Sequence, residues 1–411
     1  MSKRLITTNS ELGSFRTCRK RHWFRYRERL VPKRKAKPLG VGSATHAGVA
    51  AMYQRIQKEQ QGILLSRPLS ADELMASALN AMRGKLGEFI AHLSDAMANA
   101  QHPEDIEKLI DESKSMETEA ESSVTRFVER FGPDDGMKYV VLAAEHPFEV
   151  PLLDANGRDG SRISWAGVMD LVLFDPSLRD YIVGEHKTTS QDALYADLRL
   201  DLDSQTKGYV YALHGLLKSP PQAWGLAPIE DAKVGRVFYN VVRKGGPKRP
   251  SINKDGTVSV AKCATTKEVY AQALEQAGVP AWAAARPAKW EELHRKQLAL
   301  MESLPGVERF VARHEGYHGK SAVEEWRGET HADGRVMRWA EHENDPLPVT
   351  RNTNACNLPW MPACPYRSIC VSDSPEAREF GFDVTTHQHI EIAEAKAEMA
   401  DAAEDPDDFG F

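Results

Sequence analysis

Two neighbouring apolar runs of the chain each carry a carboxylate. Residues Trp165–Phe174 contain Asp170, and residues Tyr181–Glu185 end on Glu185. The Asp-Pro-Ser sequence at 175–177 is a turn signal between them. We therefore predict two adjacent strands that bring the two carboxylates side by side. A hard divalent cation prefers such paired carboxylate oxygens as ligands.

A lysine follows the second carboxylate at a spacing of two residues. Side chains alternate along a strand, so we expect Glu185 and Lys187 on one face and His186 on the opposite, packing face. A metal ion on a phosphate oxygen, with a cation beside it, would orient an attacking water and offset the charge that builds on phosphorus. The alternative is a surface ion pair between Glu185 and Lys187, because a Glu-x-Lys sequence is common.

Four short motifs extend this pattern along the chain, in the order Gly42–His46, Gly167–Asp170, Glu185–Lys187 and Gln205–Tyr209. Their order resembles the PD-(D/E)XK nuclease superfamily, and within it the RecB-like branch. The resemblance covers residues 14–50, 139–215 and 350–372. It implies an α/β fold with a restriction-endonuclease-like core, in which helices flank a mixed central sheet. Helical insertions and a cysteine-ligated iron-sulfur subdomain are implied as well.

The resemblance also implies a set of metal ligands. Asp170, Glu185 and His46 would hold Mg²⁺ or Mn²⁺, together with the backbone carbonyl of His186. A neutral imidazole is a ligand that Mn²⁺ accepts. Taken alone, His46 would more often be a structural histidine at a helix end or a core edge.

Two further residues, Gln205 and Tyr209, lie one helical turn apart and can reach the same groove. The resemblance implies that both are catalytic and that Gln205 contacts DNA, whereas periodicity alone also allows Tyr209 to be a core residue. On the preceding apolar run, Glu145 and Glu149 are alternative acidic residues for the site. The sequence does not choose between them.

The chain has five cysteines, an odd number, and no apolar amino-terminal segment that would export it, so structural disulfides are not expected. Three of them, Cys356, Cys364 and Cys370, crowd together, which is typical of a metal site. The resemblance implies that Cys18 is the fourth ligand of a 4Fe-4S cluster. The seven residues between Cys356 and Cys364 exceed the usual gap of two. A zinc ion with four thiolates is the rival, and Cys263 is expected to be a buried thiol without a partner.

The net charge of −6 hides a basic first segment, in which residues 1–40 hold thirteen Lys or Arg. We predict nucleic-acid binding by cations and an aromatic group within this segment, namely Arg19, Lys20, Arg21, Trp23 and Arg25. The alternative is that Trp23, Phe24 and Tyr26 form an apolar cover beside the cluster.

The opposite end, residues 373–411, is acidic and is expected to be disordered. Its last five residues, 407–411, read Asp-Asp-Phe-Gly-Phe and resemble the acidic, aromatic-ended tips of single-stranded-DNA-binding proteins, which dock replication and repair partners. A tail that only aids solubility is the alternative.

The remaining segments suggest five parts of the chain. They are the basic segment 1–40, a nuclease core 41–250 with a helical insertion at 66–131, a helical and short-strand insertion 251–350, the cysteine segment 351–372 and the tail 373–411. We expect helices over 266–317 and a strand-like ribbon near 325–350. A membrane-spanning stretch and a phosphate-binding Gly-rich loop are both missing from the pattern, which favours a cytoplasmic protein without a helicase motor.

Together these patterns favour a Mg²⁺- or Mn²⁺-dependent DNA exonuclease that acts on single-stranded ends in recombination, repair or phage DNA processing. One alternative is a protein that uses the fold to bind DNA or recruit a partner. The other is a nuclease of the CRISPR-adaptation type, or one directed at RNA, which would share every motif.

Overall fold

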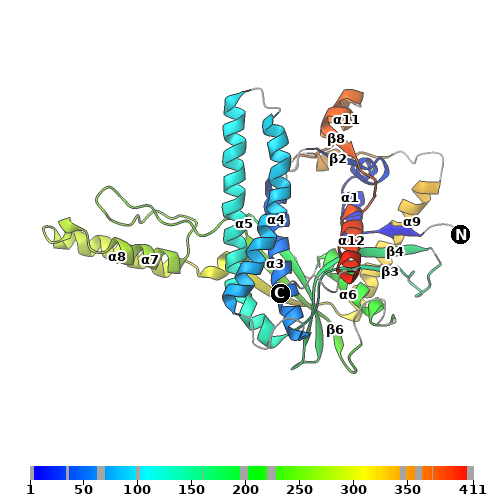
Figure 1. Ribbon diagram of the computed structural model, residues 1–411, viewed down its shortest axis with the longest axis horizontal. Coiled ribbons are helices and arrows are strands. Elements are labelled where there is room, and N and C mark those ends of the chain that lie inside the picture. The colour runs from blue at the N-terminus through cyan, green and yellow to red at the C-terminus, as the bar shows by residue number, and fades with distance from the viewer. Residues whose placement is uncertain are drawn as a thin grey trace.

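A central sheet lies between two groups of helices, and a separate arm projects to one side (Figure 1). The computed structural model describes residues 4–33, 37–62, 70–98, 102–160, 162–194, 202–219, 228–342, 349–356, 363–372 and 374–404. Over these residues, no helix has both the length and the apolar character needed to cross a membrane.

The sheet is mixed and has six strands within the described residues. They are β1 (Leu5–Thr7), β3 (Val140–Pro151), β4 (Ile163–Asp175), β5 (Asp180–Thr189), β6 (Lys233–Arg243) and β7 (Val311–Tyr317). β3 runs antiparallel along one edge of β4, so β5 and the short β1 both pair with its other edge. β5 and β6 are parallel, and β7 lies antiparallel to β6. This arrangement confirms the predicted fold class.

The two predicted strands form the expected hairpin, β4 and β5, and both are longer than the sequence indicated. β4 continues to Asp175, and β5 continues to Thr189. At the turn, Oδ1 of Asp175 accepts hydrogen bonds from the backbone N–H groups of Ser177 at 2.9 Å and Leu178 at 3.2 Å. The aspartate therefore closes the turn with its own side chain, which confirms the turn signal.

Helices cover both faces of the sheet. One face packs against α1 (Asn9–Thr17), α6 (Ser204–Leu216) and α9 (Lys320–His342). The other face packs against α3 (Lys37–Gln60), α4 (Ala71–Ala98) and α5 (Pro103–Lys138). Along β5, Tyr181 and Val183 face the first group, while Ile182 faces the second. This alternation fixes which face each site residue on β5 reaches.

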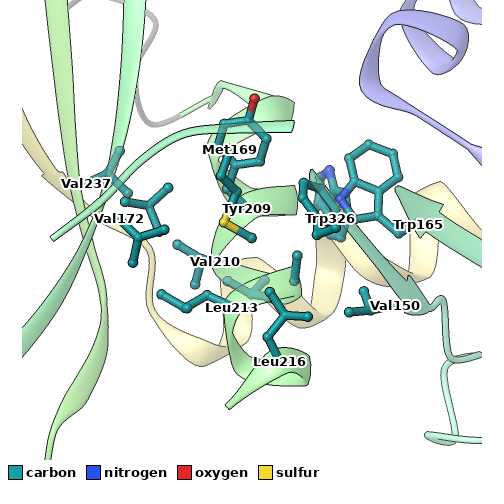
Figure 2. Close-up of a cluster of buried hydrophobic side chains, with 14 of the residues drawn as sticks. Val150, Trp165, Met169, Val172, Tyr209, Val210, Leu213, Leu216, Val237 and Trp326 are labelled. Atoms are coloured by element: carbon teal, nitrogen blue, oxygen red, sulfur yellow. The ribbon is translucent and has the colours of Figure 1, made fainter. Parts of the chain in front are cut away.

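Helix α6 lies very close to β4. Figure 2 shows Val210 and Leu213 of this helix directed toward the cluster around Met169. The indole N–H of Trp165 donates to the backbone carbonyl of Gly208 at 3.1 Å. A Cβ at Gly208 would lie 2.5 Å from the Trp165 ring, so glycine permits this close approach.

The predicted helical insertion at 66–131 corresponds to α4 and α5, and α5 continues to Lys138. The N-terminus of α4 has a capping box. The N–H of Ser70 donates to Oε2 of Glu73 at 2.8 Å, and the N–H of Glu73 donates to Oγ of Ser70 at 3.2 Å. Both helices are fixed to the core by apolar residues that pack against α3.

The two ends of the chain are joined by a small second sheet. Its strands are β2 (Leu30–Pro32) and β8 (Phe382–Val384), which pair antiparallel. Short helical segments lie around it, namely α2 (Arg19–His22), a π-helical turn η1 (Trp23–Arg27), η6 (Thr353–Ala355), α10 (Arg367–Ser372) and α11 (Pro375–Gly381). The amino-terminal segment and the cysteine segment thus share one structural unit.

The segment after residue 304 differs from the sequence-based expectation. Residues 311–317 were expected to be helical and form β7, while residues 320–342, expected in part as a ribbon, form α9. β7 is a strand because the exposed edge of β6 supplies hydrogen-bond partners, which local sequence does not reveal. Trp326 of α9 is buried against the sheet, so this part of 251–350 belongs to the core and is not an insertion.

The expected disorder of residues 373–411 is wrong for much of that range. Residues 375–384 form α11 and β8, and α12 (Ile390–Glu404) lies against β3 and β4. Ile392 is buried there, and Nζ of Lys396 is 3.3 Å from Oε2 of Glu149. Tertiary contacts supply the stabilisation that composition alone did not indicate. The acidic, aromatic tip at 407–411 lies outside the described residues.

The arm that projects in Figure 1 consists of an irregular hairpin followed by helices. Its helices are α7 (Lys267–Ala277), η4 (Ala281–Ala283) and α8 (Pro287–Ser303), and η5 (Val307–Arg309) leads back to the sheet. The arm has its own small core, centred on Val258, Tyr270 and Ala273. It is therefore a structural unit distinct from the layers around the sheet.

Candidate active site

Three side chains from three elements meet beside the β3–β4 pair. His46 comes from α3, Glu145 from β3 and Asp170 from β4, and one ligand atom of each lies within 4.8 Å of the other two. Nδ1 of His46 is 3.7 Å from Oδ2 of Asp170. Two carboxylates and an imidazole at this separation suit one small divalent cation. The structure thus brings together the predicted ligands His46 and Asp170.

Glu145 reaches the site through an unusual backbone conformation. Its φ is 51°, in the left-handed region that residues other than glycine rarely adopt. Its two chain neighbours pair with Leu171 and Met169, which places Glu145 opposite Asp170 without joining the ladder. Such strain is typical of functional positions that the surrounding fold holds in place.

The other acidic residue considered on this strand, Glu149, is directed elsewhere. Its carboxylate contacts Nζ of Lys396 at 3.3 Å and is about one-third exposed, with 34% relative accessibility. The two glutamates are four residues apart, so strand alternation alone assigns them to the same face. Only the backbone conformation at Glu145 separates them. The sequence carried no signal for that choice.

Glu185 is the most deeply buried acid of the site. The residue is 2% exposed, and its Oε1 pairs with Nζ of Lys187. Its Oε2 is buried and has no hydrogen-bond partner among the described residues. Burial, and next the charge of Asp170, raise the pKa of Glu185 to about 8. This oxygen is buried without a partner and lies beside the group formed by His46, Glu145 and Asp170. A bound cation would satisfy it.

Burial also shifts the pKa values of Asp170 and His46. Burial raises the pKa of Asp170 to about 6, and the hydrogen bond from the backbone N–H of His186 to Oδ2, at 2.8 Å, opposes this shift. Burial lowers the pKa of His46, so its imidazole is held neutral. The neutral ring is the form that binds metal ions.

His46 reaches the sheet because α3 approaches β5 closely. A Cβ at Gly42, one helical turn before His46, would lie 3.1 Å from Oγ1 of Thr188. The Gly42–His46 motif therefore combines a close helix–strand contact with a ligand that faces the strands. This placement favours a ligand role for His46 over that of a histidine in the core.

Lys187 is the first member of a hydrogen-bonded chain. Its Nζ donates to Glu185 and to Oε1 of Gln205 at 2.7 Å. Nε2 of Gln205 donates to the hydroxyl of Tyr209 at 2.8 Å, which donates to the carbonyl of Val168 at 2.7 Å. Burial lowers the pKa of Lys187, but Glu185, Asp203 and Asp170 together raise it by more, so the lysine stays charged. Its ammonium is held at the edge of the cation site.

Tyr209 is joined to the site through its hydroxyl, and its catalytic role stays a prediction. It is 4% exposed and packs in the core, as Figure 2 shows, with its hydroxyl connecting Gln205 to β4. Asp203 caps α6 by accepting from the N–H of Gln205 at 2.6 Å, so the helix begins at Ser204, one residue before Gln205. Nδ2 of Asn9 also donates to Gln205 at 3.3 Å, a contact that sequence reasoning missed because it spans 196 positions.

His186 faces away from Glu185 and Lys187, which confirms the predicted alternation. Its ring stacks on Tyr53 at a centroid distance of 5.7 Å and an angle of 14°, and it is 3% exposed. Burial lowers the pKa of His186, which keeps the ring neutral. This ring forms the floor between the cation site and the α3–α5 layer.

A buried polar network holds His186 from behind. Arg313 donates to both carboxylate oxygens of Asp135 at 2.7 Å and, through Nε, to Oδ1 of Asn240 at 2.7 Å. Since arginine can only donate, the Asn240 amide nitrogen must face Nδ1 of His186, at 3.2 Å. His186 therefore accepts at Nδ1. These residues lie far apart in the sequence, and no motif indicated them.

Comparison with known proteins decides the family. A family model described as the PD-(D/E)XK nuclease superfamily matches residues 7–371, which is most of the chain and includes the whole site. The chain belongs to the PD-(D/E)XK nuclease superfamily. Asp170 and the Glu185-x-Lys187 sequence lie within the matched range. A search of curated proteins finds no match.

Nucleases of this superfamily use divalent metal ions, and this nuclease has a carboxylate and histidine site that fits one. The residues that fit are Asp170, His46 and Glu145, with Glu185 adjacent. Membership also makes DNA the expected class of substrate. The basic segment and the cysteine segment bear on the type of nuclease within the superfamily.

The basic segment of this nuclease packs its aromatic residues inward. Phe24 and Tyr26 are buried, and Nζ of Lys20 lies 4.8 Å from the centre of the Phe24 ring. Trp23 is half-buried, and its indole N–H donates to Glu28 at 2.9 Å. Phe24 therefore packs with Cys364 and Cys370, whereas Tyr26 packs against His22 and His389. The residues predicted to bind nucleic acid, Arg19, Lys20, Arg21, Trp23 and Arg25, lie on α2 and η1.

The four predicted ligand cysteines lie in the unit formed by the two chain ends, and all are half-buried free thiols. Sγ of Cys18 accepts from the N–H of Asn352 at 3.4 Å, and the N–H of Cys364 donates to the carbonyl of Cys356 at 3.1 Å. Cys364 and Cys370 pack against the apolar cluster around Phe24. Burial raises the pKa of Cys364. Among the described residues, no three cysteine sulfurs lie within 4.8 Å of one another.

Cys263 differs from the expectation of a buried thiol. It lies on the projecting arm, is half-buried, and its Sγ contacts the carbonyl of Lys248 at 3.9 Å. The hairpin that carries it is covered on one side only. This cysteine lies apart from the other four.

Proposed function

We propose that this nuclease is a metal-dependent DNA exonuclease of the RecB-like type that acts on single-stranded ends. The observation that carries the proposal is the buried Oε2 of Glu185, which has no hydrogen-bond partner among the described residues and lies beside Asp170 and Lys187. Such an oxygen is costly to bury unless a ligand occupies the site. Mg²⁺ or Mn²⁺ is the ligand that this donor set fits.

Each residue of the site would have a distinct role in hydrolysis. His46, Asp170 and Glu185 would hold the cation. Glu145 has a ligand atom within 4.8 Å of those of His46 and Asp170, so it is placed to join them. When bound, the cation would polarise the scissile phosphate and lower the pKa of an attacking water. Lys187, held by Glu185 and Gln205, would orient that water and offset developing charge.

The burial of the acids supports a single-stranded substrate. Asp170 is 6% exposed and Glu185 is 2% exposed, so a phosphate must enter closely among side chains to reach them. A duplex is stiff over many tens of base pairs, whereas a single strand bends at every nucleotide. Gln205, half-buried on α6, is placed to contact the entering strand.

The test is a cleavage assay with Mg²⁺ or Mn²⁺ on end-labelled single- and double-stranded DNA and RNA, and on circular single-stranded DNA. We expect linear single-stranded DNA to be degraded and circles to survive. Lys187→Ala should lose activity by about 10²-fold or more, as expected for loss of a charge-stabilising donor. Lys218→Ala, an exposed lysine after the end of α6, is the matched control. Equal activity of the two variants would refute the mechanism, and cleavage of circles would refute exonuclease action.

We also propose that Cys18, Cys356, Cys364 and Cys370 hold a 4Fe-4S cluster that joins the two chain ends. Support comes from the convergence of both segments on one apolar unit, where Phe24 and Tyr366 stack at 5.7 Å. A zinc ion held by the same four thiolates is the rival.

Anaerobic purification tests the cluster. We expect a brown protein with iron and sulfide, and we expect Cys18→Ser to lose both while Cys263→Ser keeps them. Colourless protein with stoichiometric zinc would instead establish the zinc site.

A further inference from the structure

A basic arm, residues 244–304, leaves the sheet at the end where catalysis is proposed. β6 runs parallel to β5, and its last residue, Arg243, pairs in register with Thr189, two residues beyond Lys187. The N–H of Lys244 then donates to the carbonyl of Thr189 at 2.7 Å. The arm therefore begins within a few residues of the active site and projects from the body past α5 (Figure 1).

The root of the arm is held firmly. Arg126 of α5 is 7% exposed, and its guanidinium donates to the carbonyls of Arg243 at 3.1 Å and Gly245 at 3.2 Å. The guanidinium carbons of Arg126 and Arg243 lie 5.7 Å and 5.0 Å from the centre of the Phe310 ring. A buried arginine that binds two backbone carbonyls fixes the direction in which the arm leaves the sheet.

The first part of the arm is an irregular hairpin, residues 248–264. Ile252 and Val258 form an antiparallel bridge, and the N–H of Lys248 donates to the carbonyl of Ala264. Gly256, with φ of 82°, lies in the tight turn at its tip. About seven residues from base to tip correspond to a reach of roughly 23 Å.

The helices of the arm support the hairpin from one side. The Tyr270 hydroxyl donates to the carbonyl of Ser259 at 2.8 Å, and the Gln297 amide donates to the carbonyl of Val258 at 3.0 Å. At the tip, the indole N–H of Trp282 donates to the carbonyl of Asp255 at 3.1 Å. Three side-chain donors thus hold the backbone, so the opposite side of the hairpin is a preorganised, solvent-exposed surface.

That hairpin carries an excess of cations. Residues 244–264 contain five Lys or Arg and one acid, Asp255, in a chain whose net charge is −6. The carboxylate of Asp255 accepts from the hydroxyl of Thr257 at 2.6 Å. Lys248, Lys254 and Lys262 are exposed, and none of the three forms an ion pair within the described residues. Exposed cations without an ion-pair partner are available to bind phosphates.

We propose that the basic arm binds the phosphate backbone of the nucleic-acid strand beyond the catalytic groove. The inference rests on the proposed function and deepens it, because it assigns the enzyme a second contact with long substrates. Phosphate contacts of this kind fix register without reading sequence. A strand that passes over the arm would be held while its end lies at Lys187, so short oligonucleotides would not benefit from the arm.

The test compares two triple variants with the same change in charge. The arm variant is Lys248→Gln, Lys254→Gln and Lys262→Gln. The control is Lys218→Gln, Lys233→Gln and Lys320→Gln, three exposed lysines near the opposite end of the sheet. Affinity for labelled single-stranded DNA of 12 and 60 nucleotides is measured by fluorescence anisotropy in EDTA over a range of salt, and cleavage of both lengths is measured with Mn²⁺.

We expect the arm variant to bind the long strand about tenfold more weakly near 0.05 M salt, with a salt slope lower by about two, since each single-strand phosphate contact contributes about 0.7. The short strand should be bound and cleaved normally. Equal binding of the long strand by the two variants would overturn the inference, even where cleavage occurs. Arm-dependent binding without cleavage by any form would support the arm and reject the proposed nuclease function.

Discussion

The backbone N–H of His186 donates a hydrogen bond to Oδ2 of Asp170 across 2.8 Å. This bond joins the two strands of the hairpin at the point where each carries an acid of the candidate site. It fixes the orientation of the Asp170 carboxylate. Glu185 and Lys187 flank His186 on β5, and their side chains lie on the face opposite to the His186 ring. The geometry of the site is therefore built into the pairing of β4 and β5.

Glu145 should contribute to metal binding, and Glu149 should not. We expect Glu145→Gln to lower Mn²⁺ affinity by about tenfold or more, because it removes a charged oxygen within reach of His46 and Asp170. Glu149→Gln, on the same strand and paired with Lys396, is the control. Isothermal titration of both variants with Mn²⁺ measures the difference. Equal affinities would show that Glu145 lies outside the metal site.

The metal-free protein should lose stability as the pH rises. Burial raises the pKa of Asp170 to about 6 and that of Glu185 to about 8, so the folded state binds more protons than the unfolded state above about pH 4.5. The free energy of unfolding then falls as the pH rises toward 8. Added Mn²⁺ should reverse this trend, because the cation replaces the protons.

Denaturant unfolding in EDTA between pH 5 and 8.5 tests this dependence. Glu185→Gln cannot ionise, so we expect its stability to vary less with pH than that of the native protein. An unfolding free energy that rises with pH to the same extent in both proteins would contradict the prediction.

Gly208 should be intolerant of a side chain. A Cβ there would lie 2.5 Å from the Trp165 ring, whose indole is held by its hydrogen bond to the same residue. We expect Gly208→Ala to destabilise the fold by about 1–3 kcal/mol and to reduce activity by displacing Gln205. Gly87→Ala on α4, where nothing lies within 4 Å, should be neutral or stabilising. Thermal unfolding and a cleavage assay of both variants provide the comparison.

The buried pair of Arg313 and Asp135 should be essential for folding stability. Arg313→Met leaves the Asp135 carboxylate, 2% exposed, without its cation, and we expect a loss of about 3–5 kcal/mol. Arg83→Met breaks an exposed pair with Glu121 and should change stability by less than about 1 kcal/mol. Urea denaturation measures both, and similar losses would contradict the assigned importance of the buried network.

Local patterns predicted the parts of this nuclease that depend on residues close in sequence. Strand alternation placed Glu185 and Lys187 on one face and His186 on the other, and helical spacing joined Gln205 to Tyr209. The Ser70 capping box also follows from local hydrogen bonding. Each of these relations spans at most four residues, within which backbone geometry alone fixes the neighbours.

Relations between distant segments could not be read in this way. Strands β2 and β8, near the two ends of the chain, pair across 350 or more positions. Residues 311–317 became a strand because β6 offered an open edge. Residues 390–404 became a helix that packs on β3 and β4, although their composition indicated disorder. Partners supplied by the rest of the fold outweighed the local preferences.

The sequence by itself was enough to predict the superfamily, because the order of the motifs around Asp170, Glu185 and Lys187 is local information. Only the tertiary structure decided that Glu145, and not Glu149, joins His46 and Asp170, and that Asn240 holds His186 in place. The physical reason is that the sequence specifies the type and order of the side chains. Burial, strain at a single φ angle and contacts over 50 or more positions arise only when the layers pack.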